Sequence, residues 1–238
     1  MLFHNTPITF IKDLKNEAHV TLNDIVYTAL SQALHDYCKK HQDSVLQQKG
    51  VKTQFRALMP FAFPRPEKET SDKSSALRNK WVFISSDMGI GHDNLIGRLK
   101  YIHESMDKIK HSPTPFCQLA VQSNVPPYLP TAMARKTVYD TFTRHSMVFS
   151  NVPGPNRLCA IAGHTAAGVH FLFNNLLPQV NVLTYNGFLF MNMVVDHDAL
   201  PDCDHIPILF SKALVDLAEH FKVSVPLDVA LHASTKML

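Results

Sequence analysis

The sequence lacks the features that identify several common classes of protein. Its most apolar window runs from Phe188 to Val195, contains Asn192, and is far shorter than the roughly 20 residues that a membrane helix needs. The N-terminus carries no stretch typical of a secretory signal peptide. We therefore expect a cytoplasmic protein, or one whose contact with a membrane is peripheral.

Charge of one sign, cysteine pairs and glycine-rich motifs are also scarce. The formal net charge is only +3, and the lysines and arginines are scattered, which argues against a nucleic-acid partner. No glycine-rich phosphate cradle of the P-loop type is present. The cysteines lie far apart with no CxxC pair, so we expect a reduced compartment and buried thiols rather than a disulfide framework or a zinc ribbon. They are Cys38, Cys117, Cys159 and Cys203.

What is present is the composition of an ordinary globular protein, with 238 residues, 45% apolar and 18% charged. We predict one domain over residues 1–238. Residues 1–20 carry no start signal of a complete domain and are interpreted as the remnant of an inter-domain connection, in which 8–18 form a short apolar strand and an amphipathic turn. Residues 61–80 contain proline and nearly balanced charges, which predicts a solvated loop.

Hydrophobic periodicity predicts the helices of the first half. Residues 21–40 repeat apolar side chains at helical spacing, and Thr21 and Asp24 stand where an N-cap and its partner three residues later belong. Strands are expected over 51–60 and 80–88, and the second strand leads through a glycine-containing break to a helix that Asp93 can cap. A further helical region, 113–144, is interrupted by prolines that lack a backbone donor, namely Pro126, Pro127 and Pro130.

The second half is predicted to be mostly strand, over 145–151, 157–163 and 167–173. Asn186-Gly187 then separates two apolar runs, and this dipeptide accepts positive φ at both centres of a two-residue hairpin turn. The second run is apolar at almost every position, so we expect it to be covered on both faces. A closing amphipathic helix is predicted over 204–221. This order of elements predicts an α/β fold, a two-layer sandwich in which a mixed β-sheet carries helices on one face.

A cluster of titratable residues, DHDALPDCDH, follows the hairpin from Asp196 to His205. Carboxylates, two histidines and Cys203 within ten residues suggest a metal site. The simpler interpretation is that Asp202 and Asp204 cap the last helix, and no spacing matches a recognised ligand motif. We therefore predict no metal here, and we expect Asp196 to be the member of the cluster that matters.

Four stretches, in order, resemble the C-terminal part of the bacterial and plant wax ester synthase/diacylglycerol acyltransferase family, which is related to the chloramphenicol acetyltransferase type of CoA-dependent acyltransferases. VTLNDIVYTAL at 20–30 resembles the family's NDVVLA motif, and FSNVPGP at 149–155 resembles its NVPGP turn. LTYNG at 183–187 and VVDHDALPD at 194–202 resemble its SYNG strand and the acidic, proline-containing segment that follows. The order and spacing of the four make the resemblance specific.

The resemblance implies both a fold and a reaction. The fold would be one half of a pseudo-dimer of two similar α/β halves with a tunnel between them. The reaction would transfer a long-chain acyl group from acyl-CoA, as substrate rather than cofactor, to a fatty alcohol or diacylglycerol, giving wax esters or triacylglycerol. The partners implied are an N-terminal acyltransferase half or a second subunit, and a membrane or lipid-droplet surface contacted peripherally.

The sequence departs from the family at its most important motif. The HHxxxDG motif, whose second histidine is taken to be the general base, does not occur. His103 and Asp107 alone have HxxxD spacing, but they lack the paired histidine and lie inside a helical pattern. We therefore predict no catalytic residue in this chain. A non-catalytic module that binds acyl-CoA or a partner, or a truncated product, remain open as alternatives.

The residues that match the family motifs each have a structural explanation beside the functional one. Asn23 and Asp24 occupy the first turn of a helix, where a carboxylate caps free backbone donors, and the resemblance adds support of the catalytic loop. Asn151, Pro153 and Gly154 belong to a rigid turn in which the glycine is free to take positive φ, and the resemblance places this turn beside the acyl-CoA channel. The remaining tunnel or motif residues implied by the resemblance are Tyr185, Asn186, Gly187 and Asp196.

Overall fold

The computed structural model describes residues 1–63, 80–124, 128, 130–155, 157–173 and 176–235. Its centre is a six-stranded sheet with the order β1-β8-β7-β4-β2-β3. The sheet is mixed, because β2, β4 and β7 pair in parallel while β1 with β8, β7 with β8, and β2 with β3 pair antiparallel. The strands are β1 (Thr6–Pro7), β2 (Arg56–Ala62), β3 (Trp81–Asp87), β4 (Met147–Val152), β7 (Gln179–Tyr185) and β8 (Phe188–Val194).

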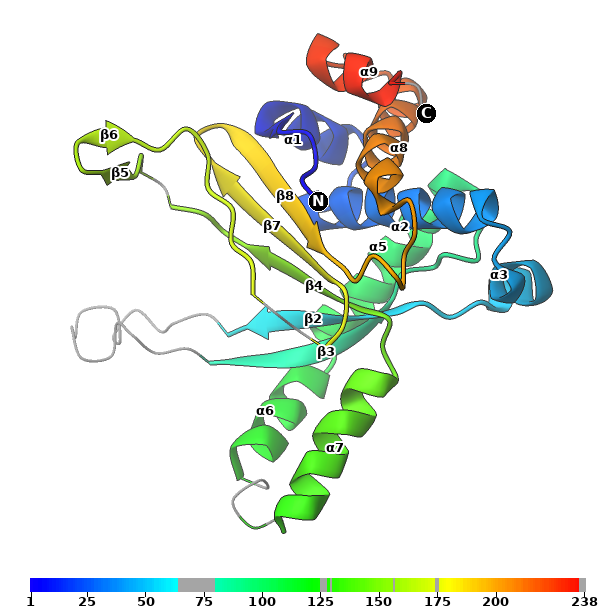
Figure 1. The fold of residues 1–238 in the computed structure, drawn as a ribbon, viewed down its shortest axis with the longest axis vertical. Coiled ribbons are helices and arrows are strands. Elements are labelled where there is room, and N and C mark those ends of the chain that lie inside the picture. The colour runs from blue at the N-terminus through cyan, green and yellow to red at the C-terminus, as the bar shows by residue number, and fades with distance from the viewer. Residues whose placement is uncertain (64–79, 125–127, 129, 156, 174–175, 236–238) are drawn as a thin grey trace.

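Helices α1, α2, α5 and α8 gather against one face of this sheet, and α6 and α7 extend beyond its β3 edge (Figure 1). This arrangement confirms the predicted mixed α/β fold. A small separate hairpin, β5 (Ala160–Ile161) with β6 (His164–Thr165), projects to the side, at the left of Figure 1. The helices are α1 (Ile8–Glu17), α2 (Leu22–Lys40), α3 (Ser44–Lys49), α5 (Leu95–His111), α6 (Thr114–Asn124), α7 (Thr131–Thr143), α8 (Ile206–Phe221) and α9 (Leu227–Ala233).

The prediction of a strand and turn over 8–18 is wrong, because α1 occupies this segment. Phe10, Ile11 and Leu14 lie on one side of α1 and are buried in the core beside α2 and α8. The apolar residues are close enough together to look like a short strand, but the i, i+1, i+4 spacing also fits a helix face. Pro7 stands just before the helix as its N-cap residue, where it needs no backbone donor.

The predicted capping of α2 is confirmed. The Asp24 N–H donates to Thr21 Oγ1 at 3.3 Å, and the Thr21 N–H donates to Asp24 Oδ2 at 2.9 Å, which forms a reciprocal capping box. Two of the backbone donors that a helix N-terminus leaves free are satisfied in this way. Most of α2 is buried, because α1, α5 and α8 surround it on the sheet.

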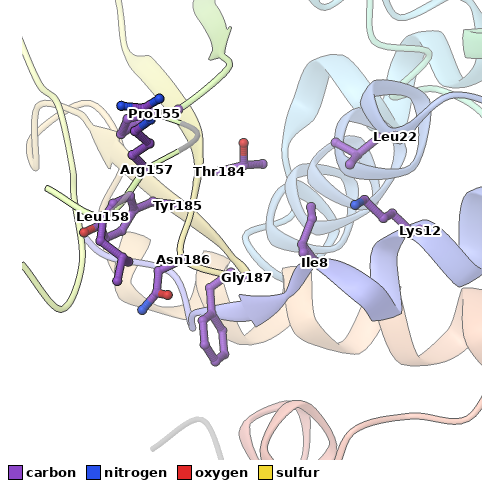
Figure 2. Close-up of a pocket in the computed structure, with 12 residues that line it drawn as sticks. Ile8, Lys12, Leu22, Pro155, Arg157, Leu158, Thr184, Tyr185, Asn186 and Gly187 are labelled. Atoms are coloured by element: carbon purple, nitrogen blue, oxygen red, sulfur yellow. The ribbon is translucent and has the colours of Figure 1, made fainter.

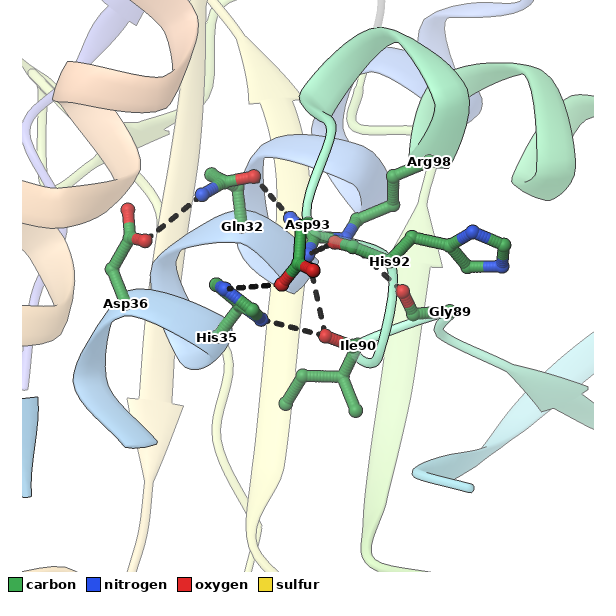
Figure 3. Close-up of polar contacts among 8 residues, drawn as sticks. All are labelled: Gln32, His35, Asp36, Gly89, Ile90, His92, Asp93 and Arg98. Carbon is green, nitrogen blue, oxygen red and sulfur yellow. Dashed lines mark hydrogen bonds and ion pairs between the residues drawn. The ribbon is translucent and has the colours of Figure 1, made fainter. Parts of the chain in front are cut away.

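The connection between β3 and α5 is held by a buried arginine rather than by the predicted cap. Arg98 on α5 is fully buried, and its guanidinium donates to the carbonyl oxygens of Gly89, Ile90 and His92 and to Gln32 Oε1 on α2 (Figure 3). Burial lowers the pKa of Arg98 to about 10, so the group still carries its charge at neutral pH. One side chain therefore fixes the loop to both α2 and α5.

The helix cap lies one residue later than predicted. Asn94, not Asp93, is the N-cap of α5, and its Oδ1 accepts hydrogen bonds from the N–H groups of Ile96 and Gly97. The Asp93 carboxylate instead lies 3.9 Å from Nε2 of His35, whose Nδ1 bonds the Ile90 carbonyl at 2.7 Å. Both residues can cap a helix, so the sequence pattern alone does not separate them.

The β7–β8 hairpin is confirmed in its turn and in its burial. Asn186 has φ 47° and Gly187 has φ 81°, as a two-residue hairpin turn of this type requires. Alternate residues of β8 are buried on opposite faces. Leu189, Met191 and Met193 join the main core, while Phe190 packs with Leu183 and Tyr185 in a second cluster.

A buried ladder of amides crosses the same hairpin. Gln179 Nε2 donates to Asn181 Oδ1 at 2.6 Å, and Asn181 Nδ2 donates to Asn192 Oδ1 at 2.9 Å. Asn192 Nδ2 then donates to the Phe171 carbonyl at 3.0 Å. The ladder satisfies polar groups that would otherwise be costly to bury, and it ties the segment before β7 to the sheet.

Several predicted boundaries were wrong. Residues 51–60 begin as a turn of 3-10 helix, Gly50–Lys52, and the strand starts only at Arg56. Of the predicted strands 157–163 and 167–173, the first contains only the two residues of β5, and the second is not a strand. The predicted loop 61–80 overlaps the end of β2, and its residues 64–79 lie outside the described chain. Helices α3 and α9 were not predicted.

Two further predictions need correction, namely that Asp202 and Asp204 cap the last helix and that the thiols are buried. Asp202 has φ 51° and precedes a 3-10 turn, Cys203–His205, and no side-chain cap bond is recorded at the start of this turn or of α8. The four cysteines are free, but Cys203 is the one that is buried, Cys38 and Cys159 are partly buried, and Cys117 is exposed.

Among the described residues, no helix is both long and apolar enough to cross a membrane.

Candidate functional site

Four of the motif residues come together in one groove, which we call the motif groove. It has a volume of about 520 Å³. One wall comes from α1 and the start of α2, and the other from the turn after β4 and the β7–β8 turn (Figure 2). Its lining residues are Ile8, Lys12, Leu22, Gly154, Pro155, Arg157, Leu158, Thr184, Tyr185, Asn186, Gly187 and Phe188.

The two walls are joined by backbone contacts at the hairpin turn. The Ile8 N–H donates to the Gly187 carbonyl at 2.9 Å, so α1 begins directly on the turn. Pro7 pairs with Phe188 in the short β1–β8 ladder. The turn that sets the register of β7 and β8 therefore also fixes the position of the α1 wall of the groove.

Gly154 is required for a different reason than the one predicted. Its φ is not positive; instead, a Cβ at this position would lie 1.7 Å from the Thr184 carbonyl oxygen. The approach arises because β4 and β7 are parallel neighbours. Their carboxyl ends therefore lie side by side, which brings the turn after Val152 next to the chain that follows Leu183. Only a residue without a side chain fits there.

Tyr185 is buried and bonded at its hydroxyl to both ends of the β5–β6 segment. The Tyr185 hydroxyl accepts the Cys159 N–H at 3.0 Å and donates to the Ala166 carbonyl at 3.0 Å. Its ring packs in the second cluster with Leu183 and Phe190. Tyr185 therefore shapes the wall of the motif groove by fixing the segment that follows the turn.

Lys12 and Arg157 make the motif groove electropositive. They stand on opposite walls, Lys12 on α1 and Arg157 in the turn after β4 (Figure 2). None of the described lining residues is acidic. Sequence reasoning missed both residues, because 145 positions of chain separate two cations that belong to no common motif. The groove can hold an elongated ligand that has an anionic group and an apolar part.

A smaller cavity of about 230 Å³ links the motif stretch 20–30 to the stretch 149–155. Asn151 Nδ2 donates to Asn23 Oδ1 at 3.2 Å, which joins the end of β4 to the first turn of α2. Both asparagines line this cavity, together with apolar side chains that include Met59, Phe149 and Met106. The structure thus brings Asn23 and Asn151 together in a cavity separate from the motif groove.

Asp24 is fully buried, and it binds His103, a contact that the sequence analysis did not predict. Its Oδ2 accepts Nδ1–H of His103 at 2.8 Å in addition to the Thr21 N–H, while no partner is recorded for Oδ1 among the described residues. The HxxxD spacing pairs His103 with Asp107, yet Asp107 lies beside His111 at 3.3 Å. Asp24 is therefore a link between α2 and α5 as well as a cap.

The last two motif residues lie away from the motif groove. Asp196 is exposed at the far end of β8 from the Asn186-Gly187 turn, where its Oδ1 accepts the Asp198 N–H at 3.0 Å. Pro153 is exposed and precedes Gly154 without being one of the described lining residues. Among the described residues, no group of three or more His, Cys, Asp or Glu side chains is placed to hold a metal ion.

Comparisons with known proteins find a matching family model and several relatives. The family model described as the WS/DGAT C-terminal domain matches residues 78–218, which is more than half of the chain. The wax ester synthase/diacylglycerol acyltransferase 2 of Arabidopsis thaliana is 24% identical over 218 residues, which cover 86% of this chain and 46% of that protein.

Solved structures share the fold at lower identity. The wax ester synthase/diacylglycerol acyltransferase from Marinobacter aquaeolei VT8 matches with a TM-score of 0.61 and 19% identity, over 92% of this chain and 48% of that one. The epimerization domain from the third module of tyrocidine synthetase B matches with a TM-score of 0.55 and 13% identity, over 92% and 47%. The chain spans about half the length of the relatives it matches.

Proposed function

The chain belongs to the family of the WS/DGAT C-terminal domain, and we propose that it is the acyl-CoA-binding half of an O-acyltransferase that makes wax esters or triacylglycerol. In this function it binds long-chain acyl-CoA. The acyl group passes to a fatty alcohol or diacylglycerol on a surface that the chain contacts peripherally. A second half, on another chain or segment, completes the tunnel.

The motif groove is the observation that carries this proposal. Acyl-CoA combines phosphates, a pantetheine arm rich in amides, and a long apolar chain. Lys12 and Arg157 offer charge to the phosphates, and Ile8, Leu22 and Leu158 offer apolar surface. The turn at Gly154 leaves backbone beside the groove for the amides. The absence of acidic lining residues among those described supports an anionic ligand.

The chemistry needs a general base that the family motif supplies. A histidine takes the proton from the acceptor hydroxyl, the oxygen attacks the thioester carbonyl, and CoA leaves as the thiolate, which is then protonated. No two histidines are adjacent in this sequence. We therefore assign the base to the second half and the binding of acyl-CoA to this chain.

The absence of adjacent histidines from the sequence also favours a second candidate, a module that binds acyl-CoA or a partner without turnover. The two candidates share the motif groove and differ only in whether a second half activates the acceptor. Binding and turnover must therefore be measured separately.

The test uses purified protein with palmitoyl-CoA and, as a control for the acyl chain, acetyl-CoA. We expect palmitoyl-CoA to bind more tightly in calorimetry, and CoA release in the presence of hexadecanol to require an added N-terminal half of a family member. Binding without such turnover would favour the non-catalytic module. Failure to bind palmitoyl-CoA at any concentration below its micelle formation would refute acyl-CoA binding in both candidates and leave only a module that binds a partner.

A further inference from the structure

Ser85 and His145 form a hydrogen-bonded pair on the outer side of the sheet, and neither is among the described residues that line the motif groove. Ser85 lies on β3 and is exposed, and its Oγ is 2.9 Å from Nε2 of His145. His145 follows the end of α7 and is partly buried. A serine hydroxyl held on an imidazole nitrogen is the contact that general-base activation of a nucleophile requires.

The second nitrogen of His145 fixes which tautomer is present. Nδ1 lies 2.6 Å from the carbonyl oxygen of Thr141, one turn earlier on α7. Because a carbonyl oxygen only accepts, the proton of the neutral ring is on Nδ1, and Nε2 carries the lone pair. Nε2 therefore accepts the Ser85 hydroxyl proton, which is the direction of transfer that makes Oγ nucleophilic.

The position of Ser85 on an edge strand provides a donor for a reacting carbonyl. The Met88 N–H bonds the Phe55 carbonyl, and the Phe63 N–H bonds the Lys80 carbonyl. Hydrogen-bonded pairs alternate along an antiparallel ladder, so the Leu58–Ser85 pair between them is not hydrogen-bonded, and the Ser85 N–H points away from β2. β3 is the last strand of the sheet, so this N–H points to its outer edge, where Gln122 of α6 donates to the Trp81 carbonyl at 3.4 Å.

A surface cavity lies beside the pair. His145 lines a cavity of about 350 Å³ together with Arg144, Thr141, Asp140 and Thr137. This volume is at the lower end of the range for small-molecule sites, which is roughly 300–1,000 Å³. Ser85 is not one of the described lining residues, so a small ester in this cavity lies beside the imidazole and must reach across it to Oγ.

We propose that Ser85 is a catalytic nucleophile that takes an acyl group from activated esters, with His145 as its general base. Ser85 Oγ attacks the ester carbonyl as its proton moves to His145 Nε2, the ester C–O bond breaks, and the proton returns to the departing oxygen. Water then attacks the acyl-serine with the same base, so one ester and one water give one acid and one alcohol. This activity is independent of acyl-CoA binding in the motif groove.

A purely structural tie between α7 and β3 would show the same hydrogen bond, and reactivity separates the two roles. The probe is p-nitrophenyl acetate, with p-nitrophenolate release followed by absorbance and the acetylated residue identified by peptide mass mapping. We expect acetyl on Ser85, none at this site in Ser85→Ala, and acylation about a hundred-fold slower in His145→Gln, at the lower end of general-base effects because a neutral carbonyl orients the ring.

Ser234 is the matched control, because its exposed hydroxyl donates to the Leu231 carbonyl instead of an imidazole. Ser234→Ala should react like the parent protein. Ser85→Ala leaves the His145–Thr141 bond intact, so it remains informative if His145→Gln fails to fold. Acetylation only at other residues, or equal rates in a folded His145→Gln, would reduce the pair to a structural tie.

Discussion

Gly154 and Thr184 approach so closely that a Cβ at position 154 would lie 1.7 Å from the Thr184 carbonyl oxygen. No rotamer change relieves such a contact, because the backbone of residue 154 fixes the Cβ position and the atom that it meets is a backbone oxygen. The contact joins the turn after β4 to the end of β7, and both segments line the motif groove. The NVPGP turn and the hairpin are therefore one structural unit.

Gly154→Ala should destabilise the protein by about 1–3 kcal/mol, the usual cost of forcing extra volume into a packed site. The measurement is the free energy of unfolding from urea titration. Gly97→Ala is the control, because its added Cβ meets only Asn94 Cβ at 3.7 Å inside α5. That change should be neutral or stabilising by up to about 1 kcal/mol. Equal stability of Gly154→Ala and the parent would show that the strands can separate.

Removal of either groove cation should weaken palmitoyl-CoA binding. Lys12→Ala and Arg157→Ala should each raise Kd about two- to five-fold, because exposed ion pairs contribute roughly 0.5–1 kcal/mol. The difference should shrink as salt is raised to 1 M, where the Debye length is about 3 Å. Lys15→Ala is the control, since Lys15 is on the same helix but bonds Asn16. If Lys15→Ala has the same effect as Lys12→Ala, the groove does not hold the phosphates.

The sequence predicted correctly those parts of the fold that depend on residues close together in the chain. The Asn186-Gly187 turn and the Thr21–Asp24 capping box depend on residues within four positions of each other, and both form as predicted. The segment 167–173 has the apolar pattern of a strand but stays outside the sheet. Its Phe171 carbonyl is taken by the buried Asn192 side chain, a distant partner that no local pattern records.

The sequence motifs named four residues of the groove but gave no sign of its two cations. Gly154, Tyr185, Asn186 and Gly187 carry motif signals, and the fold collects them in one groove. Lys12 and Arg157 complete the groove through tertiary packing of α1 against the hairpin. Asp196, which the resemblance implied as a tunnel or motif residue, lies at the opposite end of β8 because a seven-residue strand separates it from the turn.

Arg98→Lys should cost about 2–4 kcal/mol of stability. The guanidinium donates to three carbonyls and Gln32 in a buried site, and a lysine can reach fewer of these acceptors from a single point, which leaves carbonyls unsatisfied. Arg135→Lys, at an exposed position of α7, is the control and should change stability by less than about 0.5 kcal/mol. The free energy of unfolding in urea measures both. A neutral Arg98→Lys would mean that the loop is fixed by other contacts.

Stability should fall as the pH drops below about 6.5, the ordinary pKa of histidine. Burial, and then the neighbouring charge of His4, lower the pKa of His232, whose ring stacks on His4 at 5.1 Å and whose Nδ1 bonds Ser211. The unfolded chain then binds more protons than the folded one, so protonation favours unfolding. Asp228, bonded to His4, is the acidic group facing the pair.

The measurement is the unfolding free energy of the parent and of His232→Gln between pH 8 and pH 5. The variant should be less stable at high pH, because the Ser211 bond is altered, but should lose less stability on acidification. Parallel pH curves for His232→Gln and the parent would assign the acid sensitivity to another group.

The hairpin turn should matter for folding rather than for chemistry. Gly187 has φ 81° with nothing within 4 Å of an added Cβ, so a side chain there meets backbone strain and no steric clash. Gly187→Val should therefore destabilise by roughly 1–3 kcal/mol, the range for a strained backbone position, while Asn186→Gly should be nearly neutral. Denaturant midpoints of both variants give the comparison.

The consequence of the turn for the site follows from register. A slip of one residue would exchange the faces of β8, exposing Leu189 and Met191 and detaching Ile8 from the Gly187 carbonyl, so that the α1 wall of the motif groove loses its anchor. Palmitoyl-CoA affinity of Gly187→Val should then fall in parallel with its stability, and recover when the variant is stabilised by osmolyte. Lost binding at full stability would instead make the turn part of the ligand contact itself.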